Sequence, residues 1–235
     1  MAIRVDIVSI GTLGRNRIWG EKTPVRTPHA TTTLIRASVE GSAAGERERR
    51  ILVDPGLPGP ALEARLFERT GLRADEIDVI FLTSFRPAHR AGLAAFAGAK
   101  WLIHEAEQSA VERHLTELVE RADDDEVRST VGAELALLER VAVAEEDRLV
   151  PNVDLFPLAG YTPGLCGLLV AEPAQTTLIA GDAVPSRDHL LAAQVLPDAY
   201  DTEAAGEALR EVYEIADLIV PGHDNWFLNP RSAGL

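Results

Sequence analysis

Short apolar runs alternate along the chain with longer segments of helical periodicity, and most of the runs end at glycine, proline or aspartate. The runs predict strands at residues 3–10, 31–40, 50–53, 79–82, 100–104, 153–158, 168–172, 176–180 and 217–220. The helical periodicity predicts helices at residues 60–70, 105–121, 126–140 and 202–216. This alternation indicates an α/β protein. Because no linker is visible, we expect a single domain over residues 1–235 with a helical insertion at about 105–145.

The ends of the expected strands carry polar residues. The run at residues 79–82 is followed by Thr83 and Ser84, and a helix of small residues is expected to begin at about Arg90. An earlier strand ends in Asp54, directly before a helix, and the polar segment at residues 41–50 is expected to form an exposed hairpin turn. Since α/β proteins commonly bind ligands at the carboxyl ends of their strands, these junctions are candidate site positions.

Charge and cysteine content limit the kinds of partner and the cellular compartment that we expect for this chain. The chain has 23 Lys and Arg residues against 37 Asp and Glu residues, which gives a net charge of −14. This balance argues against nucleic acid or an anionic membrane as a partner, so a small molecule is the expected ligand or substrate; a homo-oligomer remains open. Cys166 is the single cysteine, which excludes an internal disulfide and fits a reducing cytoplasm. The apolar opening segment is interrupted by Arg4 and Asp6 and is too short for a signal peptide or a membrane span.

The loop after residues 79–82 has the order Thr-x-x-x-Pro-x-His-x-x-Gly-Leu, from Thr83 to Leu93. This order resembles the signature of the metallo-β-lactamase superfamily, which reads Thr-His-x-His-x-Asp-His followed by Gly-Gly-Leu. His89 keeps the position of a metal ligand. Other ligand positions of the signature are changed, and they are occupied by Ser84, Arg86 and Ala88.

Three further motifs match the same family in the same order. Residues 161–165 resemble the Thr-Pro-Gly-His loop, with Leu165 in place of the metal-binding histidine. Asp182, in Gly-Asp-Ala, holds the place of the carboxylate that bridges two metals, and His223, in Pro-Gly-His, keeps its ligand position. The resemblance covers nearly the whole chain, and it implies a four-layer αββα sandwich with a pocket at its rim.

The resemblance implies two metal sites, of which one has lost most of its ligands and the other keeps three. The first would combine Asp182 with three residues that are no longer histidine, namely Ser84, Arg86 and Leu165. A hydroxyl, a guanidinium and an aliphatic chain cannot replace three imidazoles around a divalent cation, so this site is expected to be empty. The second retains His89, Asp182 and His223, a set that can hold one zinc or iron ion. Alternatively, the three are relics in a pocket that no longer binds metal.

Other side chains are expected in the same pocket. Arg86 is expected to replace the lost cation by pairing with Asp182 or Asp54, because a carboxylate without a counter-charge is costly in a partly dry cleft. Asp54 resembles the aspartate that orients metal ligands. His189 follows Asp182 closely enough to reach the pocket. The expected pocket residues beside the three ligands are therefore Asp54, Ser84, Arg86, Leu165 and His189.

The leading functional hypothesis is a divergent hydrolase of this superfamily with a degenerate metal site. It would use at most one metal, with His89 and Asp182 at the reacting centre, to cleave an ester, thioester or lactone bond. The competing hypothesis is a catalytically inactive family member, a pseudoenzyme that binds a small anion or metabolite. In that case Arg86 would supply the positive charge.

Overall fold

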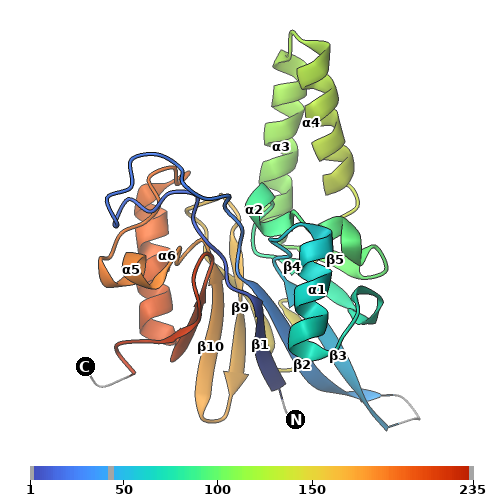
Figure 1. Ribbon diagram of the computed structural model, residues 1–235, viewed down its shortest axis with the longest axis vertical. Coiled ribbons are helices and arrows are strands. Elements are labelled where there is room, and N and C mark those ends of the chain that lie inside the picture. The colour runs from blue at the N-terminus through green and yellow to red at the C-terminus, as the bar shows by residue number, and fades with distance from the viewer. Residues whose placement is uncertain (1–2, 42–44, 233–235) are drawn as a thin grey trace.

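The computed structural model describes residues 3–41 and 45–232 and contains two six-stranded sheets with helices on their outer faces (Figure 1). The first sheet has the order β1-β2-β3-β4-β5-β6. Its strands are β1 (Ile3–Ser9), β2 (Thr32–Gly41), β3 (Gly45–Val53), β4 (Val79–Leu82), β5 (Lys100–Ile103) and β6 (Ala142–Val143). The pairs from β3 to β6 are parallel, and the two before them are antiparallel.

The second sheet has the order β12-β11-β10-β9-β8-β7. Only β10 and β11 pair in parallel within it. Its strands are β7 (Arg148–Val150), β8 (Val153–Pro157), β9 (Cys166–Glu172), β10 (Gln175–Gly181), β11 (Leu218–Pro221) and β12 (Phe227–Leu228).

Because side chains alternate between the two faces of each strand, the buried side chains form three packed layers, one between the sheets and one on the outer face of each sheet. In β3, Leu52 packs toward helix α1 (Gly59–Thr70), whereas Ile51 and Val53 pack between the sheets. On the other side of the sandwich, α6 (Thr202–Ile215) packs with Leu209 and Val212 against the second sheet. Successive strand residues point to opposite faces, so both faces of each sheet are covered. The four-layer αββα sandwich predicted from the sequence is confirmed.

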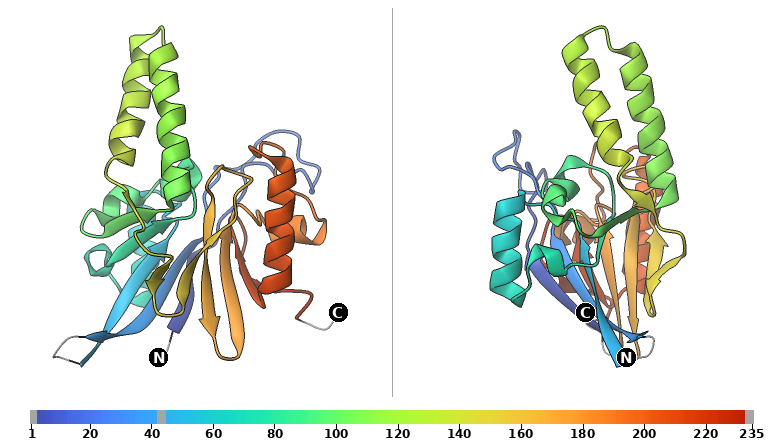
Figure 2. Two further views of the ribbon diagram at one scale, coloured as in Figure 1. Left: turned by 180° about the vertical axis from the view of Figure 1, so that it is seen from behind. Right: turned by 90° about the vertical axis from the view of Figure 1, so that its right-hand side faces the viewer.

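Two helices project from the sandwich as an antiparallel pair, as both views in Figure 2 show. These helices, α3 (Glu105–Arg121) and α4 (Asp125–Leu138), lie where the two insertion helices were expected. Leu138 and the partly buried Leu115 and Leu137 anchor the base of the pair in the core beneath α1. None of the helices in the described part of the chain is long and apolar enough to cross a membrane.

Several local expectations differ from the structure. The helix expected from about Arg90 is wrong, because the helix there, α2, is a single turn at Pro87–Arg90, followed by a 3₁₀ turn at Leu93–Phe96. Pro87 pre-sets the backbone angle of a first helical residue and so fixes this start. Short elements were also missed, namely β6, β7, β12 and α5 (Arg187–Leu191). The expected hairpin turn is shorter than residues 41–50, since β3 begins at Gly45; residues 42–44 lie outside the described part.

Four strands end at one rim of the sandwich and position the polar motifs there. Asp54 follows β3, Thr83 follows β4, Asp182 follows β10, and Gly222-His223 follow β11. Strands β3 and β4 belong to the first sheet and β10 and β11 to the second, so side chains far apart in sequence meet where the two sheets open at this rim.

Candidate functional site

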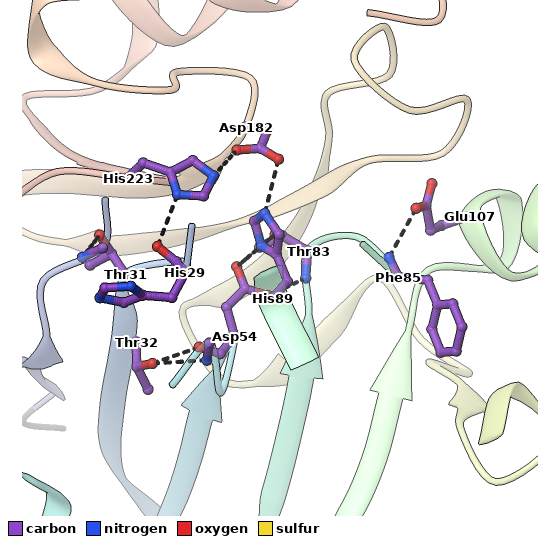
Figure 3. A network of polar contacts seen from close by, with 12 residues as sticks. His29, Thr31, Thr32, Asp54, Thr83, Phe85, His89, Glu107, Asp182 and His223 are labelled. Carbon is purple, nitrogen blue, oxygen red and sulfur yellow. Dashed lines mark hydrogen bonds and ion pairs between the residues drawn. The ribbon is translucent and has the colours of Figure 1, made fainter. Parts of the chain in front are cut away.

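His89 lies at the centre of the rim, fully buried on α2, with a carboxylate at each ring nitrogen (Figure 3). Its Nδ1 is 2.9 Å from Oδ2 of Asp54, and its Nε2 is 2.9 Å from Oδ2 of Asp182. The ring is therefore fixed in orientation from both sides.

Asp54 is held by the loop that follows β4. Thr83 donates to its carboxylate twice, from the backbone N–H to Oδ1 at 2.9 Å and from the hydroxyl to Oδ2 at 2.7 Å. Thr32 donates its hydroxyl to the carbonyl oxygen of Asp54 at 2.7 Å. Asp54 has a φ of 51°, a left-handed conformation that aspartate tolerates better than most residues. This bend after β3 turns the carboxylate toward His89.

Asp182 joins the two histidines of the cluster. Its Oδ1 lies 3.0 Å from Nε2 of His223, although the angle of this contact is not that of a hydrogen bond. His223 donates from Nδ1 to the carbonyl oxygen of His29 at 2.9 Å. Gly222 makes room for the carboxylate, because a Cβ there would lie 2.7 Å from Oδ1 of Asp182. Gly181, with a φ of 52°, makes room for Thr83, because a Cβ there would lie 2.6 Å from its Oγ1.

The charges of this cluster support one another. Burial alone would lower the pKa of His89, but the carboxylates of Asp54 and Asp182 outweigh it and raise the pKa to about 10. Burial would raise the pKa of Asp182, but His89 and His223 hold it well below its usual range. Without a metal, the centre is therefore an imidazolium between two carboxylates.

The same three residues present donor atoms to a common point. One ligand atom each from His89, Asp182 and His223 lies within 4.8 Å of the others, and all three side chains are buried. In the part of the chain that the structure describes, this is the single group of three or more such side chains that could hold a metal ion. The arrangement coincides with the set retained in the sequence motifs.

Glu107 is a site-building residue that the sequence did not reveal. It is buried on α3, where Oε1 accepts from the backbone N–H of Phe85 at 3.0 Å. Its Oε2 accepts from the hydroxyl of Thr162 at 2.7 Å and from the N–H of Gly164 at 3.1 Å. Glu107 thus joins the loop after β4 to the loop before β9. Nothing in the sequence distinguishes it from the exposed acids of the same helix.

We expect Glu107→Ala to lower the free energy of unfolding by about 3–5 kcal/mol, because it leaves three buried donors without an acceptor. Urea unfolding followed by circular dichroism measures the loss. The control is Glu105→Ala, which removes an exposed acid two residues earlier in the same helix and should change stability by no more than about 0.5 kcal/mol. Equal effects of the two substitutions would contradict this role.

A cavity of about 790 Å³ opens beside the cluster at the rim. Its wall includes Arg86, Tyr161, Asp182, His189, Asp198 and His223. Of the other expected pocket residues, Asp54 lies behind the wall against His89. Ser84 and Leu165 are fully buried: Leu165 packs in the core against α6, and the Ser84 hydroxyl has no hydrogen-bond partner among the described residues.

Arg86 lines the cavity but has a different partner from the one expected. Instead of Asp182 or Asp54, its Nη2 binds Oδ2 of Asp198 at 3.0 Å. Its guanidinium lies 4.6 Å from the ring centre of Tyr161, whose hydroxyl donates to the same Asp198 oxygen at 3.2 Å. The physical reason is that Asp54 and Asp182 already have donors in Thr83 and the histidines. The loop before α6 supplies the free carboxylate.

His189 also reaches the cavity, although it lies on the one-turn helix α5 that the sequence did not predict. Its Nδ1 is 2.7 Å from Oγ of Ser186, the N-cap of that helix. Burial lowers the pKa of His189, so the ring is neutral near pH 7.

Comparison with known structures finds the same fold in other proteins. The chain resembles a metallo-beta-lactamase-like protein from Thermotoga maritima at 20% identity, with a TM-score of 0.65 over 97% of this chain and 100% of the other. It resembles AidC, a dizinc quorum-quenching lactonase, at 15% identity, with a TM-score of 0.61 over 83% and 72%. It also resembles the hydrolase AbOPH at 13% identity, with a TM-score of 0.61 over 97% and 91%.

No curated protein matches the sequence itself. The sequence profile of the metallo-beta-lactamase superfamily matches residues 31–223, a span that runs from the residue before β2 to the last residue of the cluster, His223. The match includes all four motifs at the rim. The chain therefore belongs to the metallo-beta-lactamase superfamily.

Proposed function

We propose that the chain is a metal-dependent hydrolase of small molecules, which holds one divalent metal ion on His89, Asp182 and His223 and cleaves an ester, thioester or lactone bond. The observation that carries this proposal is the way the two histidines are held. Their Nε2 atoms meet at Asp182, while acceptors on the far side fix both Nδ1 atoms. Ligand histidines in metalloproteins commonly have this arrangement, because the bond at Nδ1 fixes the tautomer and the ring orientation.

The residues fit such a metal. Two imidazole nitrogens and one carboxylate form a donor set that suits zinc or iron and leaves positions open for water and substrate. Oδ1 of Asp182 is buried and has no hydrogen-bond partner among the described residues, and a cation would satisfy it. When bound, the metal supplies Lewis-acid polarisation of a carbonyl group and activation of water at neutral pH.

His189 supports the proposal as a hydrogen-bond donor in the cavity wall. The oxygen of Ser186 lies close to both the backbone N–H and Nδ1 of His189, so the hydroxyl proton is available to Nδ1. A neutral ring that accepts at Nδ1 carries its proton on Nε2. We assign this tautomer to His189, which would then donate to an oxygen of the substrate.

The related structures support the class of bond. AidC is a lactonase and AbOPH a hydrolase, and both share the fold. AidC is a dizinc enzyme, whereas Ser84 and Leu165 in this chain offer no imidazole and Arg86 is engaged by Asp198. These differences favour a single metal ion.

An inactive binding protein is the second candidate, and one observation favours it. His89 is fully satisfied between Asp54 and Asp182 without a metal, so the cluster can persist as a structural element. In both cases the proposed ligand is a small molecule. A cytoplasmic location and the absence of nucleic-acid and membrane partners remain predictions from composition, and a homo-oligomer remains open.

We expect protein purified without chelator to contain no more than one zinc or iron ion per chain, because three of the side chains that would hold a second ion are no longer histidines. Inductively coupled plasma mass spectrometry of the protein, with a dialysed buffer blank, measures the content. Hydrolysis of β-lactams and general phosphodiesters at the rates typical of dinuclear relatives should also be absent. Two tightly bound ions per chain would overturn the assignment.

The hydrolase proposal is tested by returning one equivalent of zinc or ferrous iron to chelated protein and assaying a panel of esters, thioesters and lactones. Metal-dependent turnover that is lost in His223→Ala supports the proposal. Stoichiometric metal without turnover of any bond class would favour the inactive alternative.

A further inference from the structure

We propose that the cavity recognises a small molecule with a compact anionic group, a carboxylate or a phosphate, which binds to Arg86, Arg15 and Arg17 of the cavity wall. The inference rests on the proposed function in so far as the same cavity would hold the scissile bond. It adds the chemical class of the substrate.

The charge of the cavity wall is opposite to that of the chain. The whole chain has an excess of acids, with a net charge of −14. The wall nevertheless contains three arginines, Arg15, Arg17 and Arg86, and only two acids, Asp182 and Asp198. A cavity that concentrates positive charge in an acidic protein attracts anions and raises their local concentration.

Both acids of the wall are already engaged. Asp182 lies against His89 and His223, and Asp198 accepts from Arg86 and Tyr161. Neither acid is therefore available to neutralise the remaining arginines.

Arg15 and Arg17 have no carboxylate partner among the described residues. Arg15 donates from Nη1 to the backbone carbonyl of Lys22 at 3.0 Å, which leaves its charge uncompensated. Arg17 is exposed and makes no ion pair in the described part of the chain. Guanidinium groups bind carboxylate and phosphate in a two-pronged manner, so uncompensated arginines on a cavity wall suit such groups.

Arg86 is fixed in place before any ligand arrives. The Tyr161 ring covers one face of its guanidinium at 4.6 Å, and Asp198 binds Nη2 at 3.0 Å. Burial would lower the pKa of Arg86, but Tyr161, Asp182 and Asp198 raise it, so the group is charged at any working pH. Its Nε and Nη1 make no hydrogen bond within the described residues, and they remain available to a ligand.

The segment with Arg15 and Arg17 is anchored at the cavity. Trp19 donates from Nε1 to Oδ2 of Asp188, on α5, at 2.6 Å. Within the segment, Oε2 of Glu21 accepts from the backbone N–H of Asn16 at 2.6 Å and also binds Arg26. Figure 1 shows this segment, in blue, lying across the rim near α5. The segment that carries Arg15 and Arg17 is thus held in place at the cavity. At about 790 Å³, the cavity has the size of a small-molecule site.

The first test measures binding with chelated protein, so that no metal contributes. Isothermal titration calorimetry with glutarate, with inorganic phosphate and with neutral glutaramide, at constant ionic strength, should give binding for at least one anion and none for the diamide. Arg86→Gln and Arg17→Gln should each weaken that binding at least tenfold, and Arg86→Lys should retain part of it. Whether glutarate or phosphate binds more tightly identifies the anionic group.

The matched control is Arg69→Gln, which removes the same charge from an exposed position on α1, away from the cavity. It should bind the anion like the wild type. If Arg69→Gln weakened anion binding as much as the cavity variants do, the effect would come from net charge alone and the proposal would be overturned. Anion binding that is unchanged in Arg86→Gln and Arg17→Gln would also overturn it. Circular dichroism of each variant excludes misfolding as the cause.

The second test compares the metal-loaded protein on two esters that differ only in a distal group, a free carboxylate in one and its methyl ester in the other. We expect kcat/KM to be at least tenfold higher for the anionic ester, and this preference to fall in Arg17→Gln. Equal kcat/KM for the two esters would overturn the substrate class while leaving the hydrolase in place. Arginine-dependent anion binding without turnover of either ester would support the anionic ligand class and contradict the hydrolase proposal.

Discussion

Replacing Asp182 with alanine is expected to abolish stoichiometric metal binding and to remove any stabilisation by zinc. Asp182 is the member of the cluster that contacts both histidines, at 2.9 Å from Nε2 of His89 and 3.0 Å from Nε2 of His223. A ligand that binds only the folded state stabilises it by RT ln(1 + [L]/Kd), which is about 2.7 kcal/mol at 100 times Kd. The melting temperature of the wild type should therefore rise when zinc is added to chelated protein, and that of the variant should not.

His223→Ala should behave in the same way, since it removes another donor of the same set. The control is Asp198→Ala, which deletes an acid from the same cavity wall but contacts Arg86 and Tyr161 rather than the histidines. It should bind metal like the wild type. If the wild type, Asp182→Ala and His223→Ala all melt at one temperature with and without zinc, the metal site does not exist and the inactive alternative stands.

The positions of several strands could be predicted because their determinants are local, whereas the four-layer arrangement was predicted from the resemblance of the motifs to the metallo-β-lactamase superfamily. A strand that is buried on both faces is a continuous apolar run, and such a run predicted β4 without help from distant residues. The positions of the motifs could also be predicted from the sequence. Gly181 and Gly222 are required where a Cβ would strike Thr83 or Asp182, so the glycines that mark the motifs also mark the close approach of the loops.

The contacts between loops could not be predicted, because they depend on which segments meet in space. The partner of Arg86, Asp198, lies 112 residues away in a loop without a motif. Glu107 has the composition of a solvated helix face, and its burial follows only from the docking of α3 against the loop at Gly164. One-turn elements such as α5 are too short to produce a periodic signal, and therefore His189 could be suspected but not placed.

The cluster around His89 can accommodate either a proton or a metal ion at Nε2. In the metal-free protein, Nε2 faces Oδ2 of Asp182 as a hydrogen-bond donor. A metal ligand must instead be deprotonated at the coordinating nitrogen, so binding a cation there releases this proton. Because the pKa of His89 is raised, both the free energy of unfolding of the chelated protein and its affinity for metal should depend on pH.

Chelated protein is expected to lose stability as pH rises above about 6.5. His89 retains its proton up to a pKa of about 10 in the folded state, against 6.5 in the unfolded chain. A raised folded-state pKa contributes its full stability below the unfolded value and loses it as pH rises through the folded value. The expected slope is about −1.4 kcal/mol per pH unit. Urea unfolding at pH 6.5, 7.5 and 8.5 measures it, below the range where Cys166, whose pKa burial raises to about 12, adds a loss of its own.

Asp182→Asn is the matched control, because it keeps the shape of the side chain but removes one of the two carboxylates that raise the pKa of His89. Its stability should fall less steeply with pH. In the wild type, the apparent affinity for zinc should rise about tenfold per pH unit over the same range, since each ion displaces one proton. Stability that is flat from pH 6.5 to 8.5, together with zinc affinity that does not depend on pH, would mean that His89 is neutral in the folded protein. Its contact with Asp182 would then not be an ion pair. The negative charges of Asp54 and Asp182 would have to be compensated by a group other than His89.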